Sequence, residues 1–90
     1  MNVVYDKLFF DKLKRVDVRI QKSVKGIILL FSKDPNNPQL NNHLLRDEFE
    51  GYRSIDITSD WRAIYQEIQT GAEKVAYFIA LGTHKQLYKK

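Results

Sequence analysis

Apolar residues recur every three or four positions through the first third of the chain. This spacing places them along one side of an α-helix, with basic residues between them. The stripe consists of Tyr5, Phe9, Leu13, Val16, Ile20, Val24, Ile27 and Phe31. It fits either one long helix or two. We favour two helices that meet near Val16–Val18, because β-branched residues weaken a helix and Asp17 is suited to cap the second one.

Alternating polar and apolar residues in the second half of the chain predict a sheet. The segments YRSIDIT, WRAIYQEI and KVAYFIAL have the length and the β-branched and aromatic content of strands. Turn residues separate them at Ser59–Asp60 and at Thr70–Glu73, so we expect an antiparallel meander. A further short strand is expected at Met1–Val4. Between the two halves, prolines and asparagines predict a loop.

These elements predict one α+β domain, residues 1–90, with two N-terminal helices packed on one face of an antiparallel β-sheet. Ninety residues are enough for one modest core and not for two. The composition, 43% hydrophobic and 12% aromatic residues, is ordinary for a globular domain. The opposite face of the sheet is not covered by these helices and must therefore contact something else.

The composition excludes several classes of protein. The chain has no cysteine, so it cannot form a disulfide framework or a Cys-based zinc site. The longest apolar run, at Gly26–Phe31, is too short to span a bilayer, and the N-terminus lacks the pattern of a signal peptide. We therefore expect a cytoplasmic protein with no membrane contact.

The net charge of +4 is placed unevenly along the chain. Residues 1–33 carry eight Lys or Arg against three Asp, a net charge of +5, whereas residues 34–90 carry seven against eight, a net charge of −1. Lys85, Lys89 and Lys90 add a basic cluster near the C-terminus. Such a field suits a polyanion or an acidic partner protein, although many small basic domains only have solvated lysine faces.

Several residues near the ends of the expected strands have side chains suited to chemistry. Asp56, Asp60 and Arg62 bracket a tight turn beside Trp61. On spacing alone, a surface salt bridge explains this cluster. His84 follows the last expected strand, where a histidine more often caps a helix or lies at the surface than acts as a catalyst.

Two longer stretches carry more specific information. They are LLRDEFEGYRSIDITSDWRAIYQEI, residues 44–68, and FIALGTHKQLY, residues 78–88. They contain a Gly-Tyr-Arg start to a strand, an Asp-Trp turn and a terminal Gly-Thr-His followed by an aromatic residue. In these features the chain resembles the RelE/ParE superfamily of bacterial toxin–antitoxin toxins, most closely its YafQ-like branch. The N-terminal half is similar only as a pair of basic helices.

The resemblance implies a toxin that cleaves mRNA, usually inside the ribosome, without a metal ion or another cofactor. In such chemistry the ribose 2′-OH attacks the adjacent phosphorus, which needs a base, an acid and positive charge or donors for the phosphorane. The need for a 2′-OH makes RNA the substrate. The implied partners are the ribosome with its mRNA and an acidic antitoxin that holds the toxin inactive.

The resemblance also implies roles for individual residues. His84 matches the histidine of Gly-Thr-His and is expected to be the general acid. Asp60 is expected to be the base or to orient the acid–base group, and His43 to be a second acid–base group. Trp61 and Tyr88 are expected to stack on substrate bases, or else only to pack within the protein.

Positive charge at the phosphate is assigned mainly to Arg62, which occupies the place of the phosphate-stabilising arginine of the RelE branch. Arg53 is a second candidate or an anchor for its strand, and Lys85 and Asp56 are further expected substrate contacts. Two positions depart from the YafQ-like pattern. Asp56 stands where that branch has a histidine, and Ala80 and Leu81 stand where it has an arginine just before Gly-Thr-His.

Two other functions fit the same sequence. A ParE-like toxin that acts on a protein target, or a degenerate nuclease, would keep the fold without cleaving RNA, and Asp56 and Ala80 favour this alternative. A basic α+β domain that binds structured RNA through shape and phosphates would depend steeply on salt and would not need His84. The combination of Asp60, Arg62 and His84 favours the nuclease.

Overall fold

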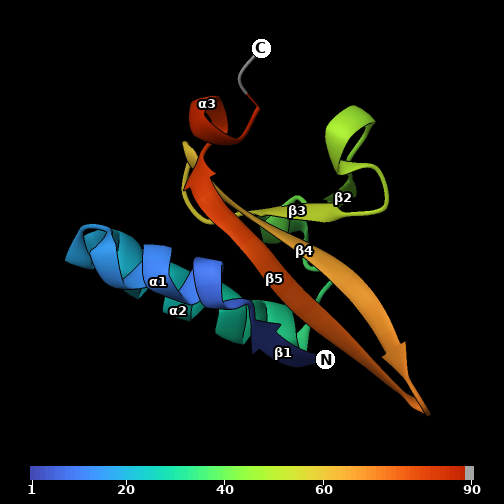
Figure 1. The fold of residues 1–90 in the computed structure, drawn as a ribbon. Coiled ribbons are helices and arrows are strands. Elements are labelled where there is room, and N and C mark those ends of the chain that lie inside the picture. Colours follow the sequence, from blue (N-terminus) through green and yellow to red (C-terminus); the bar gives the residue numbers. More distant parts are fainter. Residues whose placement is uncertain (89–90) are drawn as a thin grey trace.

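A computed structural model describes residues 1–88, which form one five-stranded sheet with two long helices on one face (Figure 1). The strands are β1 (Asn2–Tyr5), β2 (His43–Leu44), β3 (Arg53–Asp56), β4 (Trp61–Thr70) and β5 (Glu73–Thr83). The helices are α1 (Lys7–Arg15), α2 (Val18–Lys33) and α3 (His84–Leu87), with short 3₁₀ turns η1 (Pro38–Leu40) and η2 (Asp47–Phe49). This architecture confirms the α+β fold expected from the sequence.

The N-terminal segment forms two helices, as predicted. Asp17 caps α2, because its carboxylate accepts a hydrogen bond of 2.7 Å from the backbone N–H of Arg19. Asp6 caps α1 in the same way through the N–H of Leu8 at 3.0 Å. Both helices run along the same face of the sheet, and in the view of Figure 1 α1 lies in front of α2.

The sheet has the strand order β1-β5-β4-β3-β2. Strands β2 to β5 form an antiparallel meander, which confirms the two predicted hairpins. The short N-terminal strand, for which the sequence predicted no direction, is β1, and it pairs parallel with β5. A parallel pair needs a long crossover, and the chain from α1 to β4 supplies it. Strand β2 has only two residues, too few for a recognisable alternation.

The core lies between the two helices and the face of the sheet that they cover, called the helix face below. Phe78 of β5 is fully buried at its centre. Ring centroids of Tyr5, Phe9, Phe31 and Tyr65 lie 5.0–6.3 Å from that of Phe78. All eight residues of the predicted stripe belong to this core or pack against it, which confirms their common buried side. The helical placement was wrong for Tyr5, which lies on β1.

A β-bulge interrupts the pairing of β4 with β5. Ile64 pairs with Ala80 and the next residue, Tyr65, pairs with Phe78, so Ile79 has no partner in the ladder. One unpaired residue reverses the alternation of β5. Residues that would otherwise face the helices therefore face the opposite side of the sheet, called the open face below.

The far end of the β4–β5 hairpin extends beyond the helices (Figure 1). Its predicted turn at Thr70–Glu73 is confirmed, with Gly71 in the left-handed region at φ 61°. Within residues 1–88 no helix is long and apolar enough to cross a membrane.

A hydrogen bond between Asp6 and Tyr77 joins the start of α1 to β5. The Tyr77 hydroxyl donates to the Asp6 carboxylate at 2.6 Å. This hydrogen bond is the main cause that lowers the pKa of Asp6 below its ordinary value, and the bond from the Leu8 N–H is the second. The same hydrogen bond to Asp6 raises the pKa of Tyr77. Because the folded pKa of Asp6 is depressed, its contribution to stability is present above the ordinary carboxyl pKa and is lost as the pH falls through the folded value.

We expect Tyr77→Phe to lower the free energy of unfolding near neutral pH. The difference from the unchanged protein should shrink as the pH falls below about 4, where the carboxyl takes up its proton in both states. Urea unfolding at several pH values measures this difference. Tyr52→Phe is the control, because the Tyr52 hydroxyl makes no hydrogen bond within residues 1–88. A Tyr77→Phe deficit that does not change with pH would contradict the expectation.

Candidate functional site

Two rows of paired residues cross the open face of the sheet. In the first row Asp56 pairs with Arg62, and Arg62 pairs with Gly82. The second row runs through His43, Ser54, Ile64 and Ala80. Residues paired in this way share a face, so the structure brings three of the predicted site residues to the open face: His43, Asp56 and Arg62.

Arg62 and Asp56 form the predicted salt bridge, and it is largely buried. The Nε of Arg62 lies 3.0 Å from Oδ1 of Asp56, with side chains 17% and 29% exposed. The N–H does not point along this line, so Oδ1 is buried without a hydrogen bond. Nη1 of Arg62 donates to the carbonyls of Thr58 and Trp61 at 2.9 and 3.1 Å. The second terminal nitrogen, Nη2, has no partner within residues 1–88.

The short helix α3 carries His84 and was not expected from the sequence. Thr83 is its N-cap: the Thr83 hydroxyl accepts from the N–H of Gln86, whose side chain accepts from the N–H of Thr83. Thr followed three residues later by Gln is the sequence signal of this capping box, and it could have revealed the helix.

A backbone hydrogen bond joins His84 to Asp60. The His84 N–H donates to the Asp60 carbonyl at 2.8 Å, which ties the start of α3 to the turn between β3 and β4. Both side chains are exposed. The structure therefore places the two predicted residues beside each other, whereas the Asp60 carboxylate takes no part in the Asp56–Arg62 ion pair.

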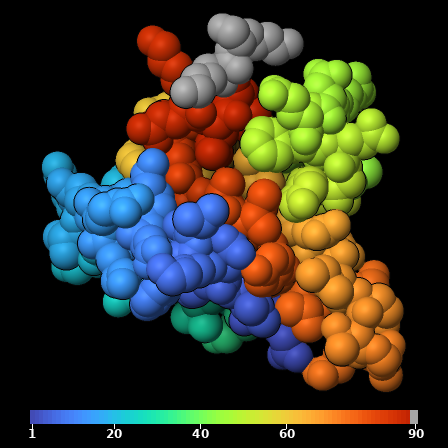
Figure 2. All heavy atoms as spheres, in the orientation of Figure 1, coloured from blue at the N-terminus to red at the C-terminus, as the bar shows by residue number. Residues whose placement is uncertain are grey.

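Tyr88 packs across the end of α3. Its ring centroid lies 4.7 Å from that of His84 and 6.1 Å from that of Phe49. Its hydroxyl donates to the Oγ of Ser54 at 3.2 Å. Figure 2 shows the C-terminal segment in red next to the green segment that contains η2. Ser54 is fully buried, and sequence reasoning gave it no role because an isolated serine in a strand has no distinctive pattern.

His43 and Arg53 point to different sides. His43 is exposed on β2, and its Nδ1 lies 2.7 Å from the carbonyl oxygen of Asn41. Arg53 belongs to the helix face, where its Nε donates to Asn42 at 2.9 Å and Asn42 donates to the hydroxyl of Tyr65. This network supports the alternative in which Arg53 anchors its strand.

Trp61 also faces the helices. It packs against the core, and the ammonium of Lys12 lies 5.9 Å from the centre of its ring. It lines a cavity of about 440 Å³ together with Asp17, Arg19, Ile20, Ser23 and Thr58. Of the predicted basic cluster, Lys85 is exposed on α3, whereas Lys89 and Lys90 lie outside the described residues.

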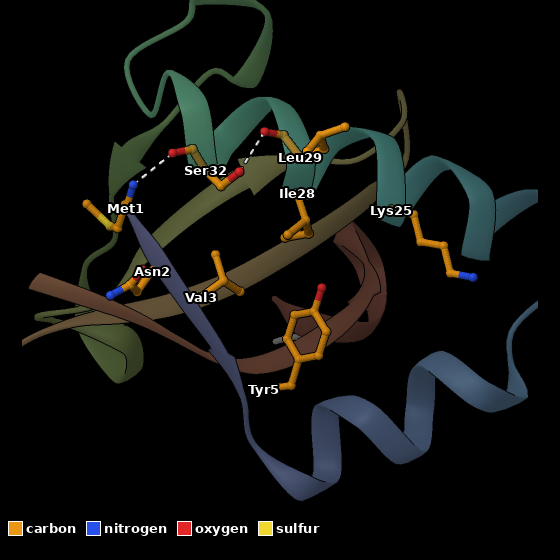
Figure 3. Close-up of a pocket in the computed structure, with 8 residues that line it drawn as sticks. All are labelled: Met1, Asn2, Val3, Tyr5, Lys25, Ile28, Leu29 and Ser32. Carbon is orange, nitrogen blue, oxygen red and sulfur yellow. Dashed lines mark hydrogen bonds between the residues drawn. The ribbon is translucent and has the colours of Figure 1, made fainter.

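Another cavity, of about 420 Å³, lies between β1 and α2, at the opposite edge of the sheet from β2 (Figure 3). Its lining consists of Met1, Asn2, Val3, Tyr5, Lys25, Ile28, Leu29 and Ser32. None of the predicted site residues is among them. In residues 1–88 no three His, Asp or Glu side chains gather to hold a metal ion. The candidate site is thus a surface of exposed and half-buried groups around α3.

Solved structures share this fold. The crystal structure of YafQ from E. coli matches with a TM-score of 0.76 and 24% identity over 97% of each chain. The YoeB/ParE toxin from Agrobacterium tumefaciens matches with a TM-score of 0.74 and 23% identity, covering 93% of this chain and 99% of that one. The E. coli DinJ–YafQ complex contains a chain that matches with a TM-score of 0.62 and 24% identity over 97% of each chain.

The family comparison covers nearly the whole sequence. The model described as bacterial toxin of type II toxin–antitoxin system, YafQ, matches residues 2–89. No curated protein matches the sequence. The family match includes the capped α3 with His84 and the turn with Asp60, and it confirms the resemblance seen in the motifs. The chain therefore belongs to the YafQ family of bacterial toxins of type II toxin–antitoxin systems.

Proposed function

We propose that this toxin inhibits translation by cleaving mRNA on the ribosome, through metal-independent attack of a ribose 2′-OH on the adjacent phosphorus. The observation that carries the proposal is the hydrogen bond from the His84 N–H to the Asp60 carbonyl. It brings the expected acid beside its expected base or orienting group. Arg62 is paired with Gly82, two residues before His84, so a cationic group lies at the same end of the sheet.

Each group has a defined task in this reaction. A base, Asp60 or His43, removes the proton of the 2′-OH, whose oxygen bonds to phosphorus and gives a 2′,3′-cyclic phosphate. His84 donates a proton to the departing 5′-oxygen, since an imidazole exchanges protons near neutral pH. The exposed first position of α3 leaves its ring accessible to a polymer substrate.

Arg62 stabilises the charge that develops on the phosphorane. Its Nη2, which has no partner within residues 1–88, is available at once, whereas two-point binding of a phosphate requires Nε or Nη1 to give up a present partner. Lys85 adds positive charge beside His84, and Tyr88 offers a ring edge for a base. Trp61 acts from the helix face, where it fixes the turn that carries Asp60.

The proposed partner is an acidic antitoxin made by the same cell. The helical segment of residues 1–33 has a net charge of +5, which favours an acidic chain. The related E. coli toxin has been solved in the DinJ–YafQ complex. Ribosome-dependent cleavage would place the active toxin in the cytoplasm.

A ParE-like action on a protein target is the second candidate. It is favoured by the open face itself, where Asp56 holds the Nε of Arg62 and Ala80 offers no charge in the neighbouring row. A site with fewer free cations stabilises a phosphorane less well. The two functions differ in whether mRNA is cut when growth stops.

We expect His84→Ala to abolish mRNA cleavage while leaving the fold intact, because the side chain is exposed and the backbone bond to Asp60 needs no imidazole. The free energy of unfolding should change by about 1 kcal/mol or less, because the lost imidazole contacts one ring, that of Tyr88. Purified protein and variant are added to a bacterial cell-free translation reaction, and mRNA ends are mapped by primer extension with and without ribosomes.

Lys74→Ala, on the exposed end of the β4–β5 hairpin, is the control for this experiment and should cleave normally. New mRNA ends that need both ribosomes and His84 would support the nuclease. Intact mRNA at a protein concentration that arrests growing cells would move the function to a protein target.

We expect Arg62→Lys to slow cleavage about tenfold to a hundredfold and to change ribosome binding by about twofold or less. Lysine keeps the charge but loses the planar fork that matches phosphate oxygens, and this matters most in the transition state. Single-turnover cleavage on saturating ribosome complexes measures the first quantity, and ribosome pelleting measures the second.

Arg53→Lys in the neighbouring strand is the matched comparison. Its guanidinium bonds to Asn42 on the helix face, so cleavage by this variant should stay within about twofold of normal. Equal losses of cleavage and ribosome binding in Arg62→Lys would assign Arg62 to docking rather than to transition-state stabilisation.

A further inference from the structure

We infer that Ser54 is a positioning residue for His84: its buried hydroxyl holds Tyr88, and the Tyr88 ring packs against the imidazole. The inference rests on the proposed function, since His84 is the expected acid. Ser54 itself is fully buried and cannot touch the substrate. It acts through two contacts, one hydrogen bond and one ring pair.

The burial of Ser54 needs an explanation, because it lies on the open face, which α1 and α2 do not cover. Its ladder neighbour Ile64 is likewise fully buried and yet does not belong to the helix-side core. The cover comes from the C-terminal turn. A Cβ added to Gly82 would lie 3.3 Å from Leu87, which shows how closely this turn approaches β5. Tyr88, the next residue of this turn, reaches Ser54 with its hydroxyl.

The hydrogen bond is what fixes Tyr88 over the strand. Ser54 is the one fully buried polar residue within residues 1–88, and a hydroxyl that loses water without gaining a partner is costly. The Tyr88 hydroxyl is its side-chain partner at 3.2 Å. The backbone N–H of Tyr88 also donates to the His84 carbonyl at 3.0 Å, which closes α3.

Tyr88 in turn restricts His84. The two rings meet edge to face, with an interplanar angle of 60° and centroids 4.7 Å apart. Phe49 also packs against Tyr88, with ring centroids 6.1 Å apart. His84 makes no side-chain hydrogen bond within the described chain, so this ring contact is the visible restraint on its orientation. Proton transfer requires the donor at hydrogen-bonding distance, so a freer imidazole would spend less time in the productive position.

Two substitutions delete the same hydrogen bond from opposite ends: Ser54→Ala and Tyr88→Phe. Each should slow single-turnover cleavage about threefold to tenfold, the range that corresponds to one neutral hydrogen bond. The ribosome concentration for half-maximal cleavage should not change. The double variant should be no slower than either single variant, because the shared bond can be lost only once. Tyr52→Phe removes a hydroxyl that has no hydrogen-bond partner within residues 1–88, and this variant should cleave normally.

A second measurement does not depend on cleavage. The chain has two histidines, so an imidazole NMR spectrum of ¹³C-labelled protein is simple, and His43→Gln assigns it. The His84 signals should move alike in Ser54→Ala and Tyr88→Phe. Melting temperatures show whether either variant has lost its fold, and all assays are made well below them.

The outcomes are distinct. If the variants lower the melting temperature but leave the His84 signals unchanged, Ser54 has only a structural role and the inference is overturned. Additive losses in the double variant would show that the two groups act separately. Faster cleavage would show that Tyr88 covers the site rather than orienting it. If the unchanged protein cuts no mRNA, the proposed function fails, and the NMR measurement still decides whether Ser54 positions His84.

Discussion

The pairing of β4 with β5 determines where the candidate residues lie. It joins the two longest strands along ten registered pairs, from Trp61–Thr83 to Thr70–Glu73. Its bulge at Ile79 moves the last residues of β5 to the other alternation, which puts Gly82 beside Arg62 on the open face. Without the extra residue, Gly82 at the start of the C-terminal turn would lie on the helix face and not on the open face that carries Ser54. The register of one hairpin therefore sets the geometry of the site.

The ion pair of Asp56 and Arg62 has two opposing effects on the candidate site. A largely buried guanidinium needs a carboxylate nearby, because an unpaired charge there would be costly. The same carboxylate lies against Nε of Arg62, one of the nitrogens that the proposed phosphate contact would use. The imperfect alignment at Oδ1 means that the pair forgoes part of its possible hydrogen bonding. Under the proposed function, a substrate phosphate would therefore compete for Arg62 at a lower cost than against a fully bonded pair.

Much of the fold could be predicted from local patterns. The helical stripe, the cap at Asp17 and both hairpin turns follow from the preferences of neighbouring residues, and the structure contains all of them. The parallel pairing of β1 could not be predicted, because it depends on how a distant crossover packs. Nor could the two-residue β2, whose pairing with β3 is visible only once the sheet has formed.

The charged and aromatic residues of the candidate site could be predicted from the sequence, but the contacts between them could not. The motifs indicated Asp60, Arg62 and His84, but no spacing shows that the first and last meet through a backbone bond. Arg53 and Arg62 look alike in the sequence, yet the pleat sends them to opposite faces. Ser54 carried no signal, because its importance comes from a residue 34 positions away.

The helix that carries His84 has only four residues, far below the length at which an isolated helix is stable in water. Its own capping box supplies part of the missing stability. The rest comes from tertiary bonds at its two ends: the Asp60 carbonyl holds its first residue, and Ser54 holds Tyr88 just beyond its last. The position of the proposed acid thus depends on an uncharged serine and a backbone carbonyl as much as on the residues that the motifs make conspicuous.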